Sequence, residues 1–338
     1  MVAKGGPALE IDGLVLRYRT RSGEVSAVED VSFALRSGEA LGLVGESGCG
    51  KTSIALAVLR LLPDNAQIAS GEIRLEGENL LTLGEEEMRQ RRWRDIAMVF
   101  QGAMNSWNPV YRIGAQIKEA MDFHWPQRPS DARARERIAE LFALVNLEPS
   151  LMDRYPHELS GGMRQRAVIA MALSCDPKVI IADEPTTALD VIVQDRILKS
   201  LKRIQRDLRM SVIYISHDIA VIAEVSEQIG VMYAGKLVEL GPTPAVFSRP
   251  RHPYTWLLFS STPSITGPRR KLQPLQGEPP NLLDPPTGCR FHPRCPLATA
   301  RCTTQTPPLA PVTGATDQQV ACWHSDRVPA LDSLVLAP

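Results

Sequence analysis

The sequence predicts an α/β fold with a mostly parallel sheet that helices cover on both faces. Residues 39–45 (EALGLVG) and 178–183 (KVIIAD) are short, nearly all-apolar runs, which is the pattern of strands buried on both sides. Residues 51–62 (KTSIALAVLRLL) have instead the apolar density of a buried helix. Because strands alternate with helices along the chain, we expect successive strands to run parallel in one sheet.

The other elements follow from the same periodicities. Further strands are predicted at residues 14–20, 25–35, 96–100 and 211–216, the first two joined by a turn at residues 22–24. Residues 112–175 are predicted to be mostly helical. Two apolar stripes at helical spacing mark amphipathic helices: Ile138, Leu141, Phe142 and Val145 in one, and Ile197, Leu201, Ile204 and Leu208 in the other.

Length, charge and composition limit the function classes. The 338 residues suffice for one large domain or two ordinary ones. Lys+Arg and Asp+Glu both number 38, so the net charge of zero argues against a broad nucleic-acid-binding face. The first residues lack the apolar core of a signal peptide, and no apolar run approaches the roughly 18 to 20 residues that span a bilayer. We expect a cytosolic chain that reaches a membrane only through a partner.

The composition changes after about residue 240. Proline becomes frequent from Pro242 onward, regular periodicity fades, and four of the six cysteines follow. We therefore expect a main domain at residues 1–240 and a separate C-terminal extension at residues 241–338, without a large core of its own.

A phosphate-binding loop is predicted at residues 45–52 (GESGCGKT). This run fits G-x-x-x-x-G-K-[ST] and lies between a predicted strand and a predicted helix, which is the context of a P-loop. Glycines let backbone N–H groups surround the β-phosphate, Lys51 reaches the β- and γ-phosphates, and Thr52 offers a hydroxyl to Mg²⁺. The nucleotide-binding residues predicted in this segment are Gly45, Glu46, Ser47, Gly48, Cys49, Gly50, Lys51, Thr52 and Ser53.

Residues 179–184 (VIIADE) supply the acidic groups that hydrolysis needs. The apolar strand delivers Asp183 to its carboxyl end, where the carboxylate can hold Mg²⁺ through a water. Glu184 follows as the candidate general base that polarises the attacking water. Beside a P-loop this reading is favoured over a surface acidic pair, and the sequence therefore predicts a nucleoside triphosphatase.

Residues 157–166 (HELSGGMRQR) narrow the class. A Ser-Gly-Gly turn that opens a helix is a second anion-binding site, and this stretch resembles the signature motif of ABC (ATP-binding cassette) ATPases. Gln101 resembles the family's Q-loop residue, Asp190 ends a D-loop-like TALD, and His217 matches the switch histidine. The resemblance covers residues 9–240 almost continuously.

The resemblance implies an ABC-type P-loop NTPase with a mostly parallel core sheet, an antiparallel β subdomain and a helical subdomain at about residues 102–175. In this family two cassettes face each other head to tail, so each ATP lies between one P-loop and the partner's signature. The implied trans residues are Ser160, Gly161, Gly162 and Met163, the last standing where the family most often has Gln. The implied magnesium ligands are Thr52, Gln101 and Asp183, and the implied catalytic residues are Lys51, Gln101, Glu184 and His217.

Three aromatic residues have two readings each. Tyr18 lies where the family stacks an aromatic ring on adenine, and a lone aromatic is otherwise a core residue. Trp107 and Tyr111 lie in the segment where such cassettes receive a transmembrane partner, and they could equally belong to the core.

The C-terminal stretch carries a second resemblance. HPYTWLLFSSTP, LQGEPPNLL and GCRFHPRCPLATARC…VACWH are similar to the extension on ATPase subunits of oligopeptide and dipeptide importers, and of related nickel importers. The implied partners are a second ATPase subunit that is a paralogue, two transmembrane permease subunits and an extracytoplasmic substrate-binding protein, with no nucleic acid. The implied location is the cytoplasmic face of the inner membrane. A nickel or glycoside importer, a soluble non-transport ABC ATPase and an Fe–S regulatory protein are the alternatives.

Cys289, Cys295, Cys302 and Cys322 form a C-x5-C-x6-C-x19-C pattern. In the cytosol clustered cysteines are more often metal ligands than disulfides. The pattern lacks the C-x2-C pairs of zinc modules, so the residues alone leave a [4Fe–4S] cluster, Zn²⁺, or a reduced or disulfide-linked tail. The resemblance favours the cluster. His292 and His324 adjoin the cysteines and are reserve ligands, and a bound metal would stabilise this proline-rich segment.

We expect different environments for the other two cysteines. Cys175 is predicted to be a buried small apolar residue. Cys49 lies beside Lys51 and a helix N-terminus, which predicts a lowered thiol pKa.

Overall fold

A computed structural model describes residues 6–187, 189–261, 275–314 and 317–331. Ala188 of the TALD motif, the final Thr262–Pro263 of HPYTWLLFSSTP and the first five residues lie outside the described part. The chain forms two compact units, which we call the first and the second unit. The first comprises Met1–Leu9, Leu35–Glu39 and Arg74–Tyr214, and the second comprises Glu10–Ala34, Ala40–Ile73 and Ile215–Pro338.

The first unit holds a parallel strand pair and most of the helices. Strand β6 (Ile96–Val99) runs parallel to β7 (Val179–Asp183), with Val99 opposite Ala182. Strand β8 (Ser211–Ile215) is fully buried, and β5 (Glu78–Asn79) pairs antiparallel with the end of β4 (Ala66–Leu75). The helices are α2 (Glu85–Arg91), α3 (Ile113–His124), α4 (Asp131–Leu144), α5 (Gly161–Ala172) and α6 (Val191–Leu208), with 3₁₀ turns at Leu80–Thr82, Ala103–Asn105, Pro149–Asp153 and Pro156–Glu158.

Both predicted helical stripes are buried, with one exception. Every member of the stripe on α4 and its C-cap, from Ile138 to Val145, lies in the core. On α6 the residues Ile197, Leu201 and Ile204 are buried, but Leu208 is 45% exposed. Leu208 is the last helical residue, and the backbone leaves the helix at Arg209 with a φ of 51°.

The second unit begins with three neighbouring strands of one sheet. Strands β1 (Pro7–Thr20), β2 (Gly23–Arg36) and β4 (Ala66–Leu75) lie in the order β2-β1-β4, so residues 14–20 and 25–35 form strands as predicted. A second sheet segment is ordered β3-β9-β10-β12-β11. Strand β3 (Ala40–Val44) is parallel to β9 (Gln228–Tyr233), and β9 is antiparallel to β10 (Lys236–Pro242). The helices are α1 (Lys51–Val58), α7 (Ile219–Val225), α8 (Thr243–Ser248), α9 (Pro253–Ser260) and α10 (Ala300–Thr304), with a 3₁₀ turn at His292–Arg294.

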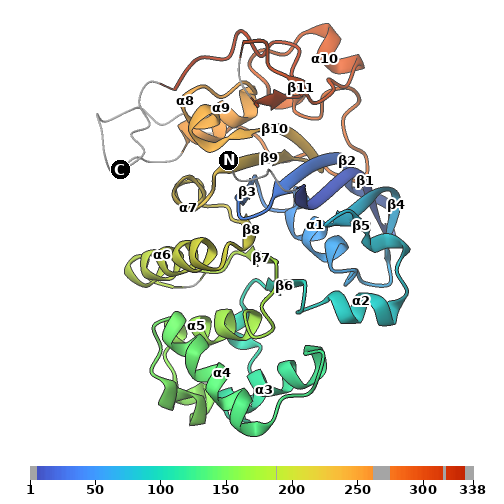
Figure 1. The fold of residues 1–338 in the computed structure, drawn as a ribbon. Coiled ribbons are helices and arrows are strands. Elements are labelled where there is room, and N and C mark those ends of the chain that lie inside the picture. The colour runs from blue at the N-terminus through green and yellow to red at the C-terminus, as the bar shows by residue number, and fades with distance from the viewer. Residues whose placement is uncertain (1–5, 188, 262–274, 315–316, 332–338) are drawn as a thin grey trace. The chain divides into compact units, whose positions relative to one another are not determined.

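The C-terminal stretch extends the sheet of the second unit. Strand β12 (Gln319–Val320) pairs with β10, and β11 (Ala310–Pro311) pairs with β12. Figure 1 shows α8, α9, α10 and β11 gathered around β10. The described part of residues 241–338 therefore packs within the same unit as the P-loop, whereas the sequence suggested a separate module. The boundary near residue 240 stays a prediction.

A buried carboxylate ties this stretch to the sheet. Glu239 on β10 has no exposed surface, and its carboxylate accepts hydrogen bonds from the backbone N–H groups of Arg251 and His252 at 2.7 and 3.0 Å. The side-chain amide of Gln318, next to β12, donates a third at 2.8 Å. Burial dominates over these hydrogen bonds and raises the pKa of Glu239 to about 7.

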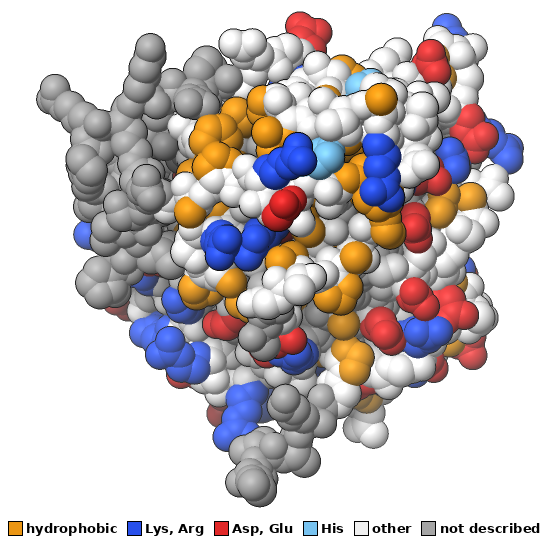
Figure 2. Space-filling view, turned by 90° about the horizontal axis from the view of Figure 1, so that it is seen from above, with side chains coloured by type: hydrophobic (Ala, Val, Ile, Leu, Met, Phe, Trp, Pro, Cys, Tyr) orange, Lys and Arg blue, Asp and Glu red, His pale blue; other side chains and the backbone are white. Residues whose placement is uncertain are grey.

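The surface carries charges of both signs, as the net charge of zero suggests. The face in Figure 2 carries hydrophobic side chains in small groups that alternate with side chains of both charges. In the described residues no helix combines the length and apolar character that a membrane span requires.

Candidate functional site

The P-loop connects β3 to α1 in the second unit, and its glycines are required by close backbone approaches. Gly45 has a φ of 147°, and a Cβ there would lie 2.1 Å from the carbonyl oxygen of Met232. Gly50 has a φ of 106°, and its Cβ would lie 2.5 Å from the carbonyl oxygen of Ala27. A side chain at either position would therefore displace the loop.

Lys51 is folded back onto the loop that precedes it. Its side chain is 7% exposed, and Nζ donates to the carbonyl oxygens of Gly45 at 2.7 Å and Glu46 at 3.1 Å. A third contact, at 3.3 Å, goes to the sulfur of Cys49. The lysine thus holds the loop closed around its own ammonium group, which is the charge that a phosphate would meet.

The first turn of α1 carries the other two predicted hydroxyls. Thr52 is exposed, and Ser53 is half-buried. Ser53 Oγ lies 3.2 Å from the phenol oxygen of Tyr18, which is also half-buried. This contact brings Tyr18 to the start of α1, beside the predicted phosphate-binding residues.

The expectation of an activated Cys49 thiol is wrong. Cys49 is 4% exposed, and burial raises its pKa even though Lys51 acts in the opposite direction. The proximity of a lysine was visible in the sequence, but the loss of hydration was not. Cys175 is 6% exposed, as predicted, and burial raises its pKa to about 11.

His217 is exposed and lies near the strand that leads into the P-loop. The backbone N–H of Ser216 donates to the carbonyl oxygen of Leu43 on β3 at 3.3 Å. Asp218 then caps α7 by accepting from the N–H groups of Ala220 and Val221. The histidine is therefore held between two anchored neighbours.

The first unit brings the two predicted catalytic side chains Gln101 and Glu184 together. Both residues follow the carboxyl ends of neighbouring parallel strands, since Val99 of β6 pairs with Ala182 of β7. Gln101 Nε2 donates to Glu184 Oε2 at 2.7 Å, and Thr187 Oγ1 donates to the same oxygen at 2.9 Å. Asp183, at the end of β7, is 1% exposed. Glu184 has a φ of 47°, a sparsely populated conformation that is typical of functional positions.

The signature and the D-loop each begin a helix in the first unit. Ser160 is the exposed N-cap of α5, and its Oγ accepts from the N–H of Met163 at 3.3 Å. Asp190 caps α6 in the same way, accepting from Val193 at 2.9 Å. A Cβ on Gly162 would lie 2.6 Å from Val193, so the two helix starts pack closely and require glycine there.

The two aromatic residues proposed for contact with a partner, Trp107 and Tyr111, differ clearly in their exposure. Trp107 is 6% exposed, and its indole N–H donates to the carbonyl oxygen of Arg164 at 3.3 Å, so it is a core residue. Tyr111 is 58% exposed and follows Val110, which is 71% exposed. Only Tyr111 of this pair remains available to a partner.

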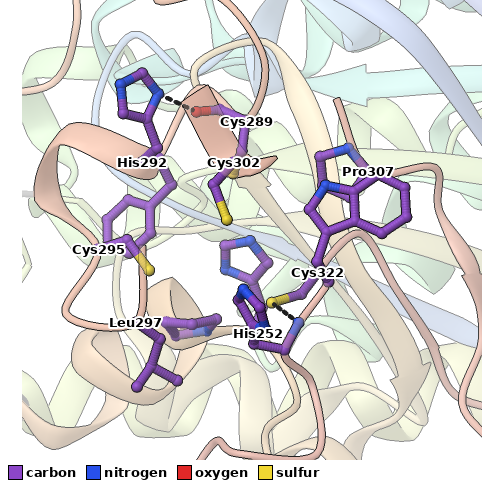
Figure 3. Close-up of a pocket in the computed structure, with 12 residues that line it drawn as sticks. His252, Cys289, His292, Cys295, Leu297, Cys302, Pro307 and Cys322 are labelled. Carbon is purple, nitrogen blue, oxygen red and sulfur yellow. Dashed lines mark hydrogen bonds between the residues drawn. The ribbon is translucent and has the colours of Figure 1, made fainter. Parts of the chain in front are cut away.

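The four C-terminal cysteines line one small pocket, which we call the cysteine pocket. Cys289, Cys295, Cys302 and Cys322 contribute to its wall together with His252, Phe291, His292, Leu297 and Trp323, among others. Figure 3 shows the labelled cysteines and His252 around this space. All six cysteines of the chain are free thiols.

Burial raises the pKa of three thiols of the pocket. It raises the pKa of Cys295 to about 11 and that of Cys322 to about 12, and it raises the pKa of Cys289 as well. Within the described residues no three His, Cys, Asp or Glu side chains come close enough to hold one metal ion. The pocket therefore gathers one buried and three half-buried thiols, without a site for a single ion among the described residues.

The reserve ligands have other contacts. His292 Nδ1 lies 3.0 Å from the carbonyl oxygen of Cys289, and His324 Nε2 lies 3.0 Å from Thr299 Oγ1. His252, which sequence reasoning did not single out, is 1% exposed and lines the pocket. Its place at the start of α9, after a proline-containing turn, gave no signal of this role.

Comparison with known proteins identifies the family. Residues 28–187 match the ABC transporter family model, and residues 238–302 match the model described as "Oligopeptide/dipeptide transporter, C-terminal region". A Sinorhizobium fredii protein, "Probable peptide ABC transporter ATP-binding protein y4tR", is 43% identical over 95% of this chain and 96% of its own length. The chain belongs to the family of ABC transporter ATP-binding proteins. Another relative, the dipeptide transport ATP-binding protein DppD of Bacillus subtilis, is 42% identical over 94% of this chain and 95% of its own.

Solved ABC cassettes share the fold. The dimeric structure of MJ0796, a bacterial ABC transporter cassette, aligns with a TM-score of 0.63 and 26% identity over 70% of this chain and 98% of that one. A dimeric post-hydrolysis structure of MJ0796 bound to ADP and Pi aligns with a TM-score of 0.63 and 25% identity over the same shares. These findings confirm the predicted ABC-type P-loop fold and the prediction that the chain is an ATPase.

Proposed function

We propose that this ABC ATPase is the motor subunit of a membrane importer for dipeptides and oligopeptides. The observation that carries the proposal is the combination, in one chain, of a complete cassette with the C-terminal region of oligopeptide/dipeptide transporters. Relatives at 42 to 43% identity over nearly the whole chain are named for peptide or dipeptide transport.

In the proposed reaction Glu184 is the general base. Its carboxylate oxygen already receives hydrogen bonds from Gln101 and Thr187, which fix its orientation. A carboxylate held in this way can accept a proton from the water that attacks the γ-phosphate. Lys51 and the P-loop amides hold the phosphates, and Thr52, Gln101 and Asp183 are the candidate Mg²⁺ ligands. His217 contacts the γ-phosphate, and Tyr18 stacks on the adenine.

Hydrolysis is proposed to require a head-to-tail pair of cassettes. Ser160 is exposed at the helix start of the signature, where its hydroxyl and the neighbouring amides can meet a partner's nucleotide. Next to the D-loop residue Asp190, Val191 is 80% and Ile192 67% exposed. Such apolar side chains on a helix start are suited to a protein interface. The related cassette MJ0796 is described as dimeric in two solved structures.

The remaining partners are proposed from the same relatives. A second, paralogous ATPase, two permeases and an extracytoplasmic binding protein would complete the importer, with this chain at the cytoplasmic face of the membrane. The exposed pair Val110 and Tyr111 is the proposed contact with a permease, since exposed aromatic and aliphatic side chains are typical anchors of interfaces.

The cysteine pocket is proposed to hold a [4Fe–4S] cluster. Four cysteines from separated segments face one space, which matches the thiolate set of such a cluster. Zn²⁺ is the alternative, and it would take all its ligands at about 2.0 to 2.3 Å from one ion. In a cluster each thiolate binds a different iron, so the sulfurs need not converge on one point. The raised thiol pKa values then predict that loading releases protons.

Two experiments test these assignments. ATPase activity of the transporter in nanodiscs should rise when a peptide-loaded binding protein is added, and Lys51→Ala should abolish it. No response to any peptide would overturn the substrate assignment but leave the ATPase. Anaerobic purification followed by iron, zinc and sulfide analysis should give about four irons and four sulfides per chain. One zinc without sulfide would overturn the cluster.

A further inference from the structure

A bidentate ion pair joins the segment of the cysteine pocket to the P-loop. Arg294, which directly precedes Cys295, donates through Nη1 and Nη2 to the two carboxylate oxygens of Glu46 at 2.8 and 3.1 Å. The arginine side chain is 7% exposed and the glutamate side chain 25%. Both residues belong to the second unit. A paired, largely buried arginine–carboxylate contact is stronger and more directional than an exposed one.

The orientation of Arg294 is fixed by further contacts. Its Nη1 also donates to the phenol oxygen of Tyr233 at 3.2 Å, and its Nε donates to the carbonyl oxygen of Gln276 at 2.8 Å. Nη2 donates to the carbonyl oxygen of Gly277 at 3.1 Å. Because the planar guanidinium uses several of its donors at once, a lysine could replace the charge but not the geometry.

Glu46 is held at three places. Besides the ion pair, its backbone N–H donates to the phenol oxygen of Tyr254 at 2.9 Å, and its carbonyl oxygen accepts from Lys51. Tyr254 lies on α9 and is fully buried. The first turn of the P-loop is therefore fixed by residues more than 200 positions later in the chain, as well as by its own lysine.

A packed aromatic cluster provides a second connection between the same two places. The rings of Tyr233 and Tyr254 have centroids 4.6 Å apart, and Phe291 meets them at 5.0 and 5.4 Å. Phe291 lies between Cys289 and Cys295 and lines the cysteine pocket. A displacement of the segment from Cys289 to Cys295 would therefore disturb both the packing of Phe291 and the ion pair of Arg294. Both lead to contacts with Glu46 of the P-loop.

We infer that Arg294 is a positioning residue for nucleotide binding, and that the affinity for Mg·ATP depends on the segment that carries Cys289 and Cys295. Arg294 keeps Glu46, and with it the first turn of the P-loop, in one conformation before the nucleotide arrives. A loop that is ordered in advance loses less conformational entropy on binding. The inference rests on the proposed function only in taking residues 45–52 as the ATP-binding loop. Because coupling is reciprocal, bound ATP also steadies the cysteine segment.

The test compares nucleotide affinity in the anaerobically purified full-length chain. The Kd for Mg·ATP is measured calorimetrically in a Glu184→Gln background, in which hydrolysis should not interfere. Arg294→Gln is expected to weaken binding about five- to tenfold, and Arg294→Lys is expected to restore only part of it. The matched control is Arg301→Gln, which lies on the same stretch but contacts Gln305 and the ring of Trp323. It should leave the Kd unchanged.

A double-mutant cycle and a reciprocal measurement complete the test. Glu46→Gln should weaken binding as Arg294→Gln does, and the double variant should be no weaker than either single one. Additive losses, or wild-type affinity in Arg294→Gln, would overturn the inference. If Arg294→Gln does not fold, the alkylation rate of Cys289 and Cys295 is measured instead in the metal-free chain without substitutions. Mg·ATP should slow this alkylation. Equal rates with and without Mg·ATP would contradict the coupling. Wild-type affinity in Lys51→Ala would instead overturn the assignment of the P-loop itself.

Discussion

The P-loop and the cysteine pocket belong to the same unit but are specified in different ways. The P-loop consists of eight consecutive residues, and Lys51 donates hydrogen bonds to Gly45 and Glu46 within the same loop. The cysteine pocket is assembled from α9, the segment around Cys289, α10 and the residues after β12. The phosphate-binding residues can therefore be recognised from one continuous motif, whereas the pocket depends on packing between distant segments.

The largest expected effect is the loss of ATP turnover when Glu184 is replaced. Glu184→Gln removes the carboxylate that accepts the proton and should lower ATP turnover at least about 100-fold, while ATP binding persists and the paired state accumulates. Steady-state hydrolysis and size-exclusion chromatography with ATP measure both. The exposed Glu148→Gln serves as the control and should behave as wild type. Wild-type turnover in Glu184→Gln would show that another group is the base.

The next effect concerns the pocket. Cys302→Ser removes one proposed cluster ligand and should reduce the iron content from about four per chain to a small fraction, because the four thiolates act as one set. Cys175→Ser, at a buried cysteine outside the pocket, should keep its iron. Iron and sulfide analysis of anaerobic samples gives the answer. Full iron in Cys302→Ser would remove this residue from the ligand set.

A matched pair of glycines compares the two regions directly. A Cβ on Gly50 of the P-loop would lie 2.5 Å from Ala27 O, and one on Gly288 would lie 2.4 Å from Cys302 O, both at positive φ. Each alanine substitution should cost about 1 to 3 kcal/mol locally. Gly50→Ala should lose ATP affinity and keep iron. Gly288→Ala should lose iron and, because its segment is joined to the P-loop through Arg294 and Glu46, should also weaken Mg·ATP binding, though less than Gly50→Ala does. Loss of both properties in both variants would mean that the regions do not fail separately.

The smallest effect is a change in the pH dependence of stability. Burial raises the pKa of Glu239 to about 7 from its ordinary value of 4.5, so the folded chain retains a proton that the unfolded chain has released between these pH values. The free energy of unfolding therefore falls as the pH rises through this window, by up to about 3 kcal/mol.

Glu239→Gln removes this titration. Its Tm should change less than that of the wild type between pH 4.5 and 7, whereas the exposed Glu24→Gln should follow the wild-type curve. Parallel curves for all three proteins would show that Glu239 does not titrate in this range.

Sequence reasoning succeeded where the chemistry is local. The alternation of buried strands and helices predicted the α/β fold, and the order of the motifs predicted an ABC ATPase. Gln101 and Glu184 were assigned separately, and their contact follows from the parallel pairing of β6 with β7 in the structure.

Sequence reasoning failed where burial or distant pairing decides. The pKa of Cys49 is raised because the thiol is buried. For Trp107 the sequence left a core position and a partner contact open, and its burial decides for the core. The ion pair of Arg294 with Glu46 joins residues 248 positions apart. The pairing of β12 with β10 was equally hidden, because two residues carry no strand pattern.

The most direct measurement is uptake of a labelled dipeptide by proteoliposomes that contain this chain, its paralogue and the permeases. Binding protein and peptide are supplied on the extracytoplasmic side and ATP on the side of the ATPases. Uptake should proceed against a concentration gradient, should require Mg·ATP and should be abolished by Glu184→Gln. ATP hydrolysis without uptake of any dipeptide or oligopeptide would contradict the proposed function.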